Sequence, residues 1–239
     1  MTNHAVELHV LVFDGCPHAE AAMEMAQSVA ERLGPGISVE RVDVDSEEKA
    51  ASLGFLGSPS LRVNGEDVEG RTTSQGALCC RTYEGGAGIP PEWRVEAAVL
   101  RALGPRGVLF LCVANSARSQ LAEGLARRLA PPGVAIYSAG SEPGTINPLA
   151  VRALAEAGVD ASAQHSKGLD AIPLGEIDLV VTLCAEEVCP LFPRPVPKLH
   201  WPLRDPAKAA GSDEERLAAF RAVRDELAAR LETLLRADS

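Results

Sequence analysis

The stretch Val108–Ser119, VLFLCVANSARS, decides the fold of the second half of this chain. An apolar run of strand length ends at Cys112, Arg118 follows six residues later, and a helix-like stretch covers residues 120–129. A strand, a tight loop and a helix N-terminus in this order gather backbone N–H groups and the positive end of a helix dipole at one point. The sequence therefore predicts a loop that binds a tetrahedral oxyanion.

Two side chains give this loop its expected chemistry. Arg118 carries a planar guanidinium fork that can grip two oxygens of an anion. The positive field of the loop should favour the thiolate form of Cys112, which is the nucleophilic form of a cysteine. The alternative is a buried cysteine at a strand end beside an unrelated exposed arginine. The strand, the spacing, the following Ser119 and the helix together favour a reactive loop.

Composition limits the size and the partners of the protein. The chain has 239 residues, of which 46% are hydrophobic, so it can form two small domains or one large one. A net charge of −10 and an aromatic content of 4% argue against a nucleic-acid partner and against an anionic membrane. Residues 1–104 carry a net charge of −8 and residues 105–239 only −2, so the predicted anion site lies in the less acidic half.

Cysteine content and segment hydropathy indicate a cytoplasmic protein. The sequence contains no run of about 18 apolar residues, and its N-terminus lacks the basic region and apolar stretch of a secretory signal. Six cysteines in a cytoplasmic chain are more often catalytic or metal-binding than structural disulfides. We expect no cofactor and no resident metal, and the sequence leaves the oligomeric state open.

The first 104 residues alternate between strand and helix patterns. Strands are expected at 7–13, 37–44 and 61–63, and helices at 18–33, 46–53 and 92–103. The turn Cys16-Pro17-His18-Ala19 opens the first helix, and Pro59 precedes the last strand. This order resembles a thioredoxin-like domain, which implies an active-site turn at Cys16 with Pro59 in the cis form beside it. The second cysteine of the usual C-x-x-C motif is absent, because position 19 is alanine.

Two adjacent cysteines, Cys79 and Cys80, lie in a polar, glycine-rich segment of the same region. One of them could form a disulfide with Cys16, or the three thiols together could bind a soft ion such as arsenite or mercury. The alternative is that the pair consists of buried small residues without a role. Residues 104–107, Gly-Pro-Arg-Gly, then form the junction between two domains expected at 1–104 and 105–239.

The second region is predicted to form a parallel sheet. Strands are expected at 108–112, 134–138, 177–183 and 198–203, with helices at 120–129, 147–157 and 213–235. Ligands of such sheets bind beyond the carboxyl ends of the strands. Cys112, Cys184 and Asp205 each follow a predicted strand, so they should converge. Asp205 is a candidate general acid for a departing oxygen, the alternative being an ordinary loop aspartate before a proline.

The loop Cys112–Ser119 resembles the C-x5-R-S phosphate-binding loop of the low-molecular-weight protein tyrosine phosphatases and of their relatives, the thioredoxin-coupled arsenate reductases. The resemblance implies an α/β fold with a parallel four-stranded sheet for residues 105–239. It also implies roles for four loop side chains: nucleophile for Cys112, oxyanion binding for Arg118, loop shape for Asn115, and thiolate stabilisation for Ser119. Ser116 is a further candidate residue of the oxyanion-binding loop.

Two further cysteines, Cys184 and Cys189, favour reduction over ester hydrolysis. A phosphatase has no use for them, whereas reduction of arsenate to arsenite takes two electrons, which one disulfide supplies. Residues 183–190 together with 200–206 resemble the arsenate-reductase branch of the family. That resemblance implies attack of Cys112 on arsenate, of Cys184 on Cys112 with release of arsenite, and of Cys189 on Cys184. The final disulfide would be reduced by thioredoxin, a similar thiol reductant, or the N-terminal domain.

The spacing of Cys184 and Cys189 constrains the segment between them. Residues i and i+5 of an α-helix lie about 8.5 Å apart at Cα, beyond the roughly 7 Å that a disulfide allows. The segment therefore cannot be helical once the disulfide has formed, and we expect it to rearrange on oxidation. A zinc site would need four ligands, and no obvious second pair accompanies these two. A tyrosine phosphatase and a thiol-based carrier or sensor of arsenite or mercury stay open as alternatives.

Overall fold

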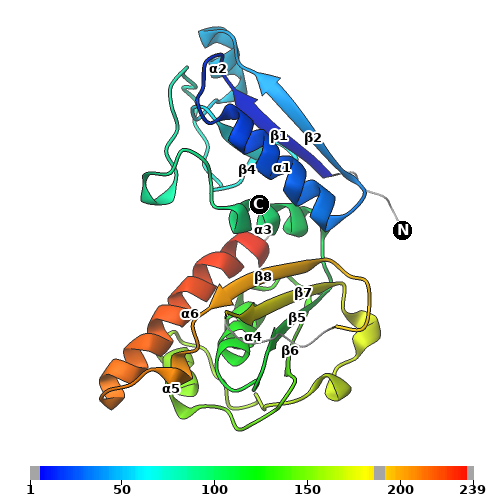
Figure 1. Ribbon diagram of the computed structural model, residues 1–239, viewed down its shortest axis with the longest axis vertical. Helices are drawn as coiled ribbons and strands as arrows, with labels where there is room; N and C mark the ends of the chain where they lie inside the picture. Colours follow the sequence, from blue (N-terminus) through cyan, green and yellow to red (C-terminus); the bar gives the residue numbers. More distant parts are fainter. Residues whose placement is uncertain (1–5, 186–191, 236–239) are drawn as a thin grey trace. The chain divides into compact units, whose positions relative to one another are not determined.

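The computed structural model describes residues 6–185 and 192–235 (Figure 1). The chain divides into two compact units, Met1–Gly104 and Pro105–Ser239. Each unit contains its own four-stranded sheet with helices packed on it. Among the described residues, none of the helices combines the length and the apolar character that crossing a membrane requires.

The first unit contains a mixed sheet in the order β2-β1-β3-β4. Its elements are β1 (Val6–Val12), α1 (Ala19–Leu33), β2 (Ile37–Asp43), α2 (Glu47–Leu53), β3 (Ser60–Val63), β4 (Glu66–Asp67), the 3₁₀ turn η1 (Glu84–Gly86) and α3 (Glu92–Leu103). Strand β1 is parallel to β2 and antiparallel to β3. The strands and helices expected from the sequence are confirmed, and β4 adds a short antiparallel partner to β3.

Strand β1 is buried along one face and at the carboxyl end of the other, next to the loop that follows it. Helices α1 and α3 pack on one face, where the α1 residues Ala22, Ala26 and Val29 are fully buried. On the other face, Leu11 joins a cluster with Ala50 of α2. The loop that carries Cys16 leaves this buried carboxyl end of β1 and leads directly into α1.

The second unit contains a sheet in the order β6-β5-β7-β8, parallel throughout, which confirms the expected architecture. Its strands are β5 (Gly107–Cys112), β6 (Ala135–Gly140), β7 (Leu179–Cys184) and β8 (Lys198–Leu203). Its helices are α4 (Arg118–Leu129), α5 (Pro148–Glu156) and α6 (Asp213–Leu235), with the 3₁₀ turns η2 (Leu169–Ala171), η3 (Leu174–Glu176) and η4 (Pro206–Lys208).

Three predicted boundaries in this unit were wrong by two residues, and one of them is the start of β7, which is Leu179 rather than Ile177. Helix α4 begins at Arg118 rather than Gln120, so the arginine belongs to the helix N-terminus itself. Strand β6 continues to Gly140 rather than ending at Ser138, because its parallel pairing with β5 extends to Cys112 opposite Gly140. A side chain at position 140 would collide with the loop after β5, and glycine lets the strand run this far.

The core of the second unit holds the carboxyl ends of its strands in place. All six residues of β5 are buried, and helices α4, α5 and α6 pack against one another (Figure 1). The predicted apolar stripe of α6 is buried: Leu217, Phe220, Val223, Leu227 and Leu231. Burial of each side chain of this size contributes about 1.5–3 kcal/mol to the free energy of unfolding. The strands therefore end on a well-packed core.

Candidate active site

Three strands of the second unit end at the same edge of the sheet. Residue Leu111 of β5 pairs with Thr182 of β7, and Cys184 of β7 pairs with Leu203 of β8. Cys112 and Cys184 therefore end adjacent strands, and Asp205 follows the end of the third. Both thiols are 2% exposed, so they are held in the sheet edge rather than displayed on the surface.

The Cys112 thiol has a built-in hydroxyl partner. Its Sγ lies 2.9 Å from Ser119 Oγ, and Asn115 Nδ2 donates to the same hydroxyl oxygen at 2.8 Å. Either atom can donate in the contact with a neutral thiol, and Ser119 is the donor when Cys112 is a thiolate. A hydroxyl donor in this position is the partner that a thiolate needs.

Asn115 organises the loop from a fully buried position. Its φ of 44° lies in the left-handed region, which asparagine adopts more readily than most residues. Besides Ser119, its Nδ2 donates to Ser138 Oγ at 2.8 Å. Its Oδ1 accepts from Gln120 Nε2 and from the Lys167 backbone N–H, each at 2.9 Å. One side chain thus ties the loop to α4, to β6 and to the segment before η2.

The carbonyl groups of the loop point outward. Val113 O accepts from Glu142 N at 3.0 Å, Ala114 O from Gly144 N at 3.0 Å, and Ser116 O from Asn147 N at 2.9 Å. In a trans peptide the N–H points opposite to the C=O, so these bonds turn the next N–H groups toward the interior of the loop. Such a ring of N–H groups at a helix N-terminus is suited to bind an oxyanion.

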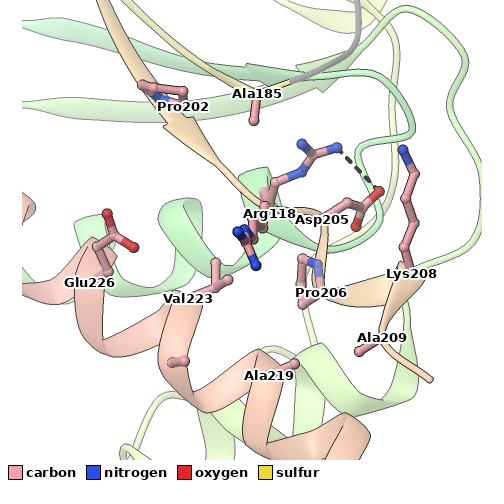
Figure 2. Close-up of a pocket in the computed structure, with 12 residues that line it drawn as sticks. Arg118, Ala185, Pro202, Asp205, Pro206, Lys208, Ala209, Ala219, Val223 and Glu226 are labelled. Carbon is pink, nitrogen blue, oxygen red and sulfur yellow. Dashed lines mark hydrogen bonds and ion pairs between the residues drawn. The ribbon is translucent and has the colours of Figure 1, made fainter. Parts of the chain in front are cut away.

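Arg118 and Asp205 face each other beside the loop. Arg118 is 4% exposed, and its Nη2 lies 3.3 Å from Asp205 Oδ2, while its Nη1 donates to Leu203 O at 3.2 Å. Both side chains line a cavity of about 680 Å³, as does Ala185, the residue after Cys184 (Figure 2). Asp205 also accepts from Ala207 N at 3.0 Å, which fixes its carboxylate at the start of η4.

A buried charge network behind the loop was missed by the sequence analysis. Glu123 is fully buried, accepts a short hydrogen bond from Ser138 Oγ and pairs with Lys167 Nζ at 3.2 Å. Ser138 and Lys167 are also partners of Asn115, so the network supports the loop from below. A glutamate four residues before Arg127 in the helix after the loop was the available signal, and these two residues do pair; the other partners of Glu123 come from β6 and from the segment before η2.

Ser58 of the first unit contacts the segment of Cys79 and Cys80 on one side and the end of β1 on the other. Phe13 N, at the end of β1, donates to Ser58 Oγ at 3.3 Å, and Cys16 follows in the same loop. On the other side, Ser58 N donates to Cys79 O at 2.8 Å, and Ser58 pairs with Cys80 in an isolated bridge. The Ser58–Pro59 bond is cis, as expected.

The role of Cys16, Cys79 and Cys80 as a joint ion site stays a prediction. Within residues 6–185 and 192–235, no group of three or more His, Cys, Asp or Glu side chains is arranged to hold a metal ion. Cys16 is half-buried, whereas Cys79 and Cys80 are exposed. Cys189 and the expected rearrangement of its segment lie outside the described residues.

Residues 107–238 match the family model of the low molecular weight phosphotyrosine protein phosphatases. This chain belongs to that family. The phosphatase-family unit, as we call residues 105–239, contains the whole match, and residues 1–106 lie outside it.

Several relatives of the phosphatase-family unit carry the name arsenate reductase. One from Halalkalibacterium halodurans is 48% identical over 128 residues, which is 53% of this chain and 92% of the relative. One from Bacillus subtilis is 47% identical over 126 residues, which is 52% of this chain and 91% of the relative.

Solved structures with the same name also match. An arsenate reductase from Archaeoglobus fulgidus is 34% identical with a TM-score of 0.46, and the match covers 54% of this chain and 98% of that one. A thioredoxin-dependent arsenate reductase from Corynebacterium glutamicum is 31% identical with a TM-score of 0.39, and the match covers 56% and 67%.

Replacing Gly140 with alanine should weaken anion binding by the phosphatase-family unit. A Cβ at this position would lie 2.3 Å from Val113 O and 2.8 Å from Asn115 N, so the loop backbone must shift. We expect the dissociation constant for inorganic phosphate, measured by calorimetry, to rise about tenfold, a loss comparable to one hydrogen bond. The control is Gly144→Ala, whose Cβ would meet Ala114 O at an ordinary 3.9 Å. Equal affinities in the two variants would contradict this role of Gly140.

Proposed function

We propose that this protein reduces arsenate to arsenite. The observation that carries the proposal is Cys184, a second buried thiol at the end of the strand next to Cys112. Ester hydrolysis in the loop needs only one thiol, whereas reduction needs two. The arsenate reductases of Halalkalibacterium halodurans and Bacillus subtilis, at 48% and 47% identity, support the same reaction.

The first step forms a bond between sulfur and arsenic. Arsenate binds to the loop N–H groups and to Arg118, which must exchange its contact with Asp205 for the anion. The Cys112 thiolate attacks arsenic, and one arsenate oxygen leaves as water after Asp205 supplies a proton. Ser119 stabilises the thiolate before the attack, and Asn115 and Ser116 maintain the loop around the anion.

The second step transfers the electrons. The Cys184 thiolate attacks the sulfur of Cys112, a new S–S bond forms, and the S–As bond breaks with its electron pair on arsenic. Arsenic is thereby reduced from the pentavalent to the trivalent state, and arsenite leaves. Two thiols have become one disulfide, so the electrons balance. Cys189 then attacks Cys184, and a thiol reductant such as thioredoxin reduces the final disulfide.

We further propose that residues 1–104 form a thioredoxin-like domain that can act as an internal reductant. Parallel β1 and β2, antiparallel β3 and β4, and a cysteine turn that leads into α1 support this assignment. Cys16 is its reactive thiol: it attacks the Cys184–Cys189 disulfide to give a mixed disulfide and one free thiol, and a second thiol from an external low-molecular-weight thiol reductant then releases Cys16. The free thiols among the described cysteines suit a cytoplasmic location, where cysteines remain reduced.

Serine variants of the later cysteines test the function. Arsenate reduction is measured by NADPH consumption with thioredoxin and thioredoxin reductase, and hydrolysis of para-nitrophenyl phosphate is measured in parallel. We expect Cys184→Ser and Cys189→Ser each to lower steady-state arsenate turnover by at least about 10³-fold, because each breaks an obligatory transfer. Aryl phosphate hydrolysis should be unchanged.

Two outcomes would contradict this function. If arsenate turnover survives Cys184→Ser, reduction does not proceed through a Cys112–Cys184 disulfide. Aryl phosphate hydrolysis in the absence of any arsenate reduction by the unmodified chain would assign the protein to the phosphatases. The internal reductant is tested by arsenite formation with a low-molecular-weight thiol in place of thioredoxin and its reductase. The unmodified chain should form arsenite under these conditions, and Cys16→Ser should not.

A further inference from the structure

The first unit displays two neighbouring thiols that the proposed reaction does not use as a pair. Cys79 and Cys80 are both free and both exposed. The two cysteines that the structure describes in the phosphatase-family unit are different, since Cys112 and Cys184 are each 2% exposed. An exposed dithiol is available to a ligand from solution without any opening of the fold.

The segment that carries this pair is anchored at both ends. Ser58 N donates to Cys79 O at 2.8 Å, and Arg81 N donates to Ser58 O at 3.0 Å. The Arg81 side chain is 4% exposed and pairs with Asp67 and Glu69 at 2.5 and 2.9 Å. A fixed backbone with free side chains means that a ligand has to order only the two cysteine rotamers.

The pair is poorly suited to form a disulfide with itself. Adjacent Cα atoms across a trans peptide are about 3.8 Å apart, whereas the Cα atoms of a disulfide are usually about 4.4–6.8 Å apart. An atom inserted between the two sulfurs lengthens the bridge and relieves this restriction. The two thiols therefore remain available to an atom that bonds two sulfurs at once.

The negative charge of the first unit favours an uncharged ligand over an anionic one. Residues 1–104 carry a net charge of −8, which disfavours oxyanions such as arsenate and phosphate. Arsenous acid is uncharged at neutral pH and is not repelled. Its trivalent arsenic is a soft centre, and thiolates are the soft ligands of proteins.

We infer that Cys79 and Cys80 form a dithiol site for trivalent arsenic. Two thiols condense with arsenous acid, two As–S bonds replace two As–O bonds, and two water molecules leave. No oxidation state changes, so the step needs neither oxidant nor reductant. The choice of arsenite, the product of this same chain, as the natural ligand rests on the proposed function. The dithiol site itself does not rest on it.

Binding of phenylarsine oxide, which takes two thiols, tests the site in the full chain. A background of Cys112→Ser, Cys184→Ser and Cys189→Ser removes the reduction chemistry and leaves three thiols. We expect one phenylarsine oxide per chain and a fall in titratable thiols from three to one. Either Cys79→Ser or Cys80→Ser should weaken binding by at least about 100-fold, the order of an intramolecular second contact. Cys16→Ser should change it by less than about 2-fold.

A second measurement does not depend on the variants. In the unmodified chain, phenylarsine oxide should protect both Cys79 and Cys80 from alkylation by iodoacetamide, as read by peptide mass spectrometry. Binding that survives both single serine variants, or that Cys16→Ser weakens as much as Cys79→Ser does, would overturn the site. Because the reduction cysteines are absent from the binding background, either result leaves the proposed reductase activity unaffected.

Discussion

Replacing Cys112 with serine should lower the kcat for arsenate reduction by at least about 10⁴-fold. Serine is nearly isosteric, but its hydroxyl is not ionised at neutral pH and it cannot form a disulfide with Cys184. Both the attack on arsenic and the electron transfer are therefore lost. The hydrogen bond to Ser119, 2.9 Å long in the native loop, has no thiolate to stabilise in the variant. The measurement is NADPH-coupled turnover with saturating thioredoxin.

The loss must come from chemistry rather than from a collapsed loop. The variant should still bind inorganic phosphate within about threefold of the native affinity, because the loop N–H groups and Arg118 are unchanged. Arg118→Lys is the matched comparison: it keeps Cys112 and the positive charge but loses the two-pronged grip. Turnover above about one thousandth of the native rate in Cys112→Ser would require another nucleophile.

The loop could be predicted from the sequence because its determinants are local. The apolar strand, the tight turn and the helix N-terminus are contiguous, and the spacing of Cys112 and Arg118 carries the anion-binding chemistry. The convergence of Cys184 and Asp205 followed from topology, since parallel strands end at one edge. The structure has these residues at the ends of adjacent strands β5, β7 and β8.

The supporting charges could not be predicted in the same way. Glu123 needs Ser138 and Lys167 to be tolerated inside the protein, and these residues lie in other elements of the unit. Glu123 also pairs with Arg127 four residues later in the same helix, which the sequence spacing does indicate, but no local pattern indicates the partners Ser138 and Lys167. A buried charge is stable only with its partners, so its position is a property of the tertiary fold.

Arg81 is the second buried charge of this kind, and its replacement by methionine should destabilise the first unit by about 3–5 kcal/mol. Its guanidinium is bidentate to Asp67 at 2.5 and 2.9 Å and donates to Ser60 Oγ at 3.0 Å. Burial lowers the pKa of Arg81, but the hydrogen bonds to Asp67 and its charge outweigh this and raise the pKa, so the guanidinium stays charged. Methionine fills the space of the stem but leaves the Asp67 carboxylate buried without its partner.

Urea unfolding of the full chain measures the effect. Trp201→Phe leaves Trp93 of α3 as the fluorescence reporter, so the signal follows the first unit rather than the average of two transitions. The matched control is Arg71→Met: Arg71 pairs with Glu69 at 3.3 Å but is 60% exposed, and its loss should cost less than about 1 kcal/mol.

A double variant separates an unpaired charge from lost packing. Arg81→Met with Asp67→Leu removes both members of the buried pair, and apolar replacements of buried ion pairs are often neutral in stability. We expect the double variant to recover more than half of the loss. If it is instead as unstable as Arg81→Met alone, the arginine acts through the ring of Tyr83, 4.4 Å from its guanidinium carbon, and through Ser60.

In either case the backbone of Arg81 is the anchor next to Cys80, so loosening it should also weaken phenylarsine oxide binding.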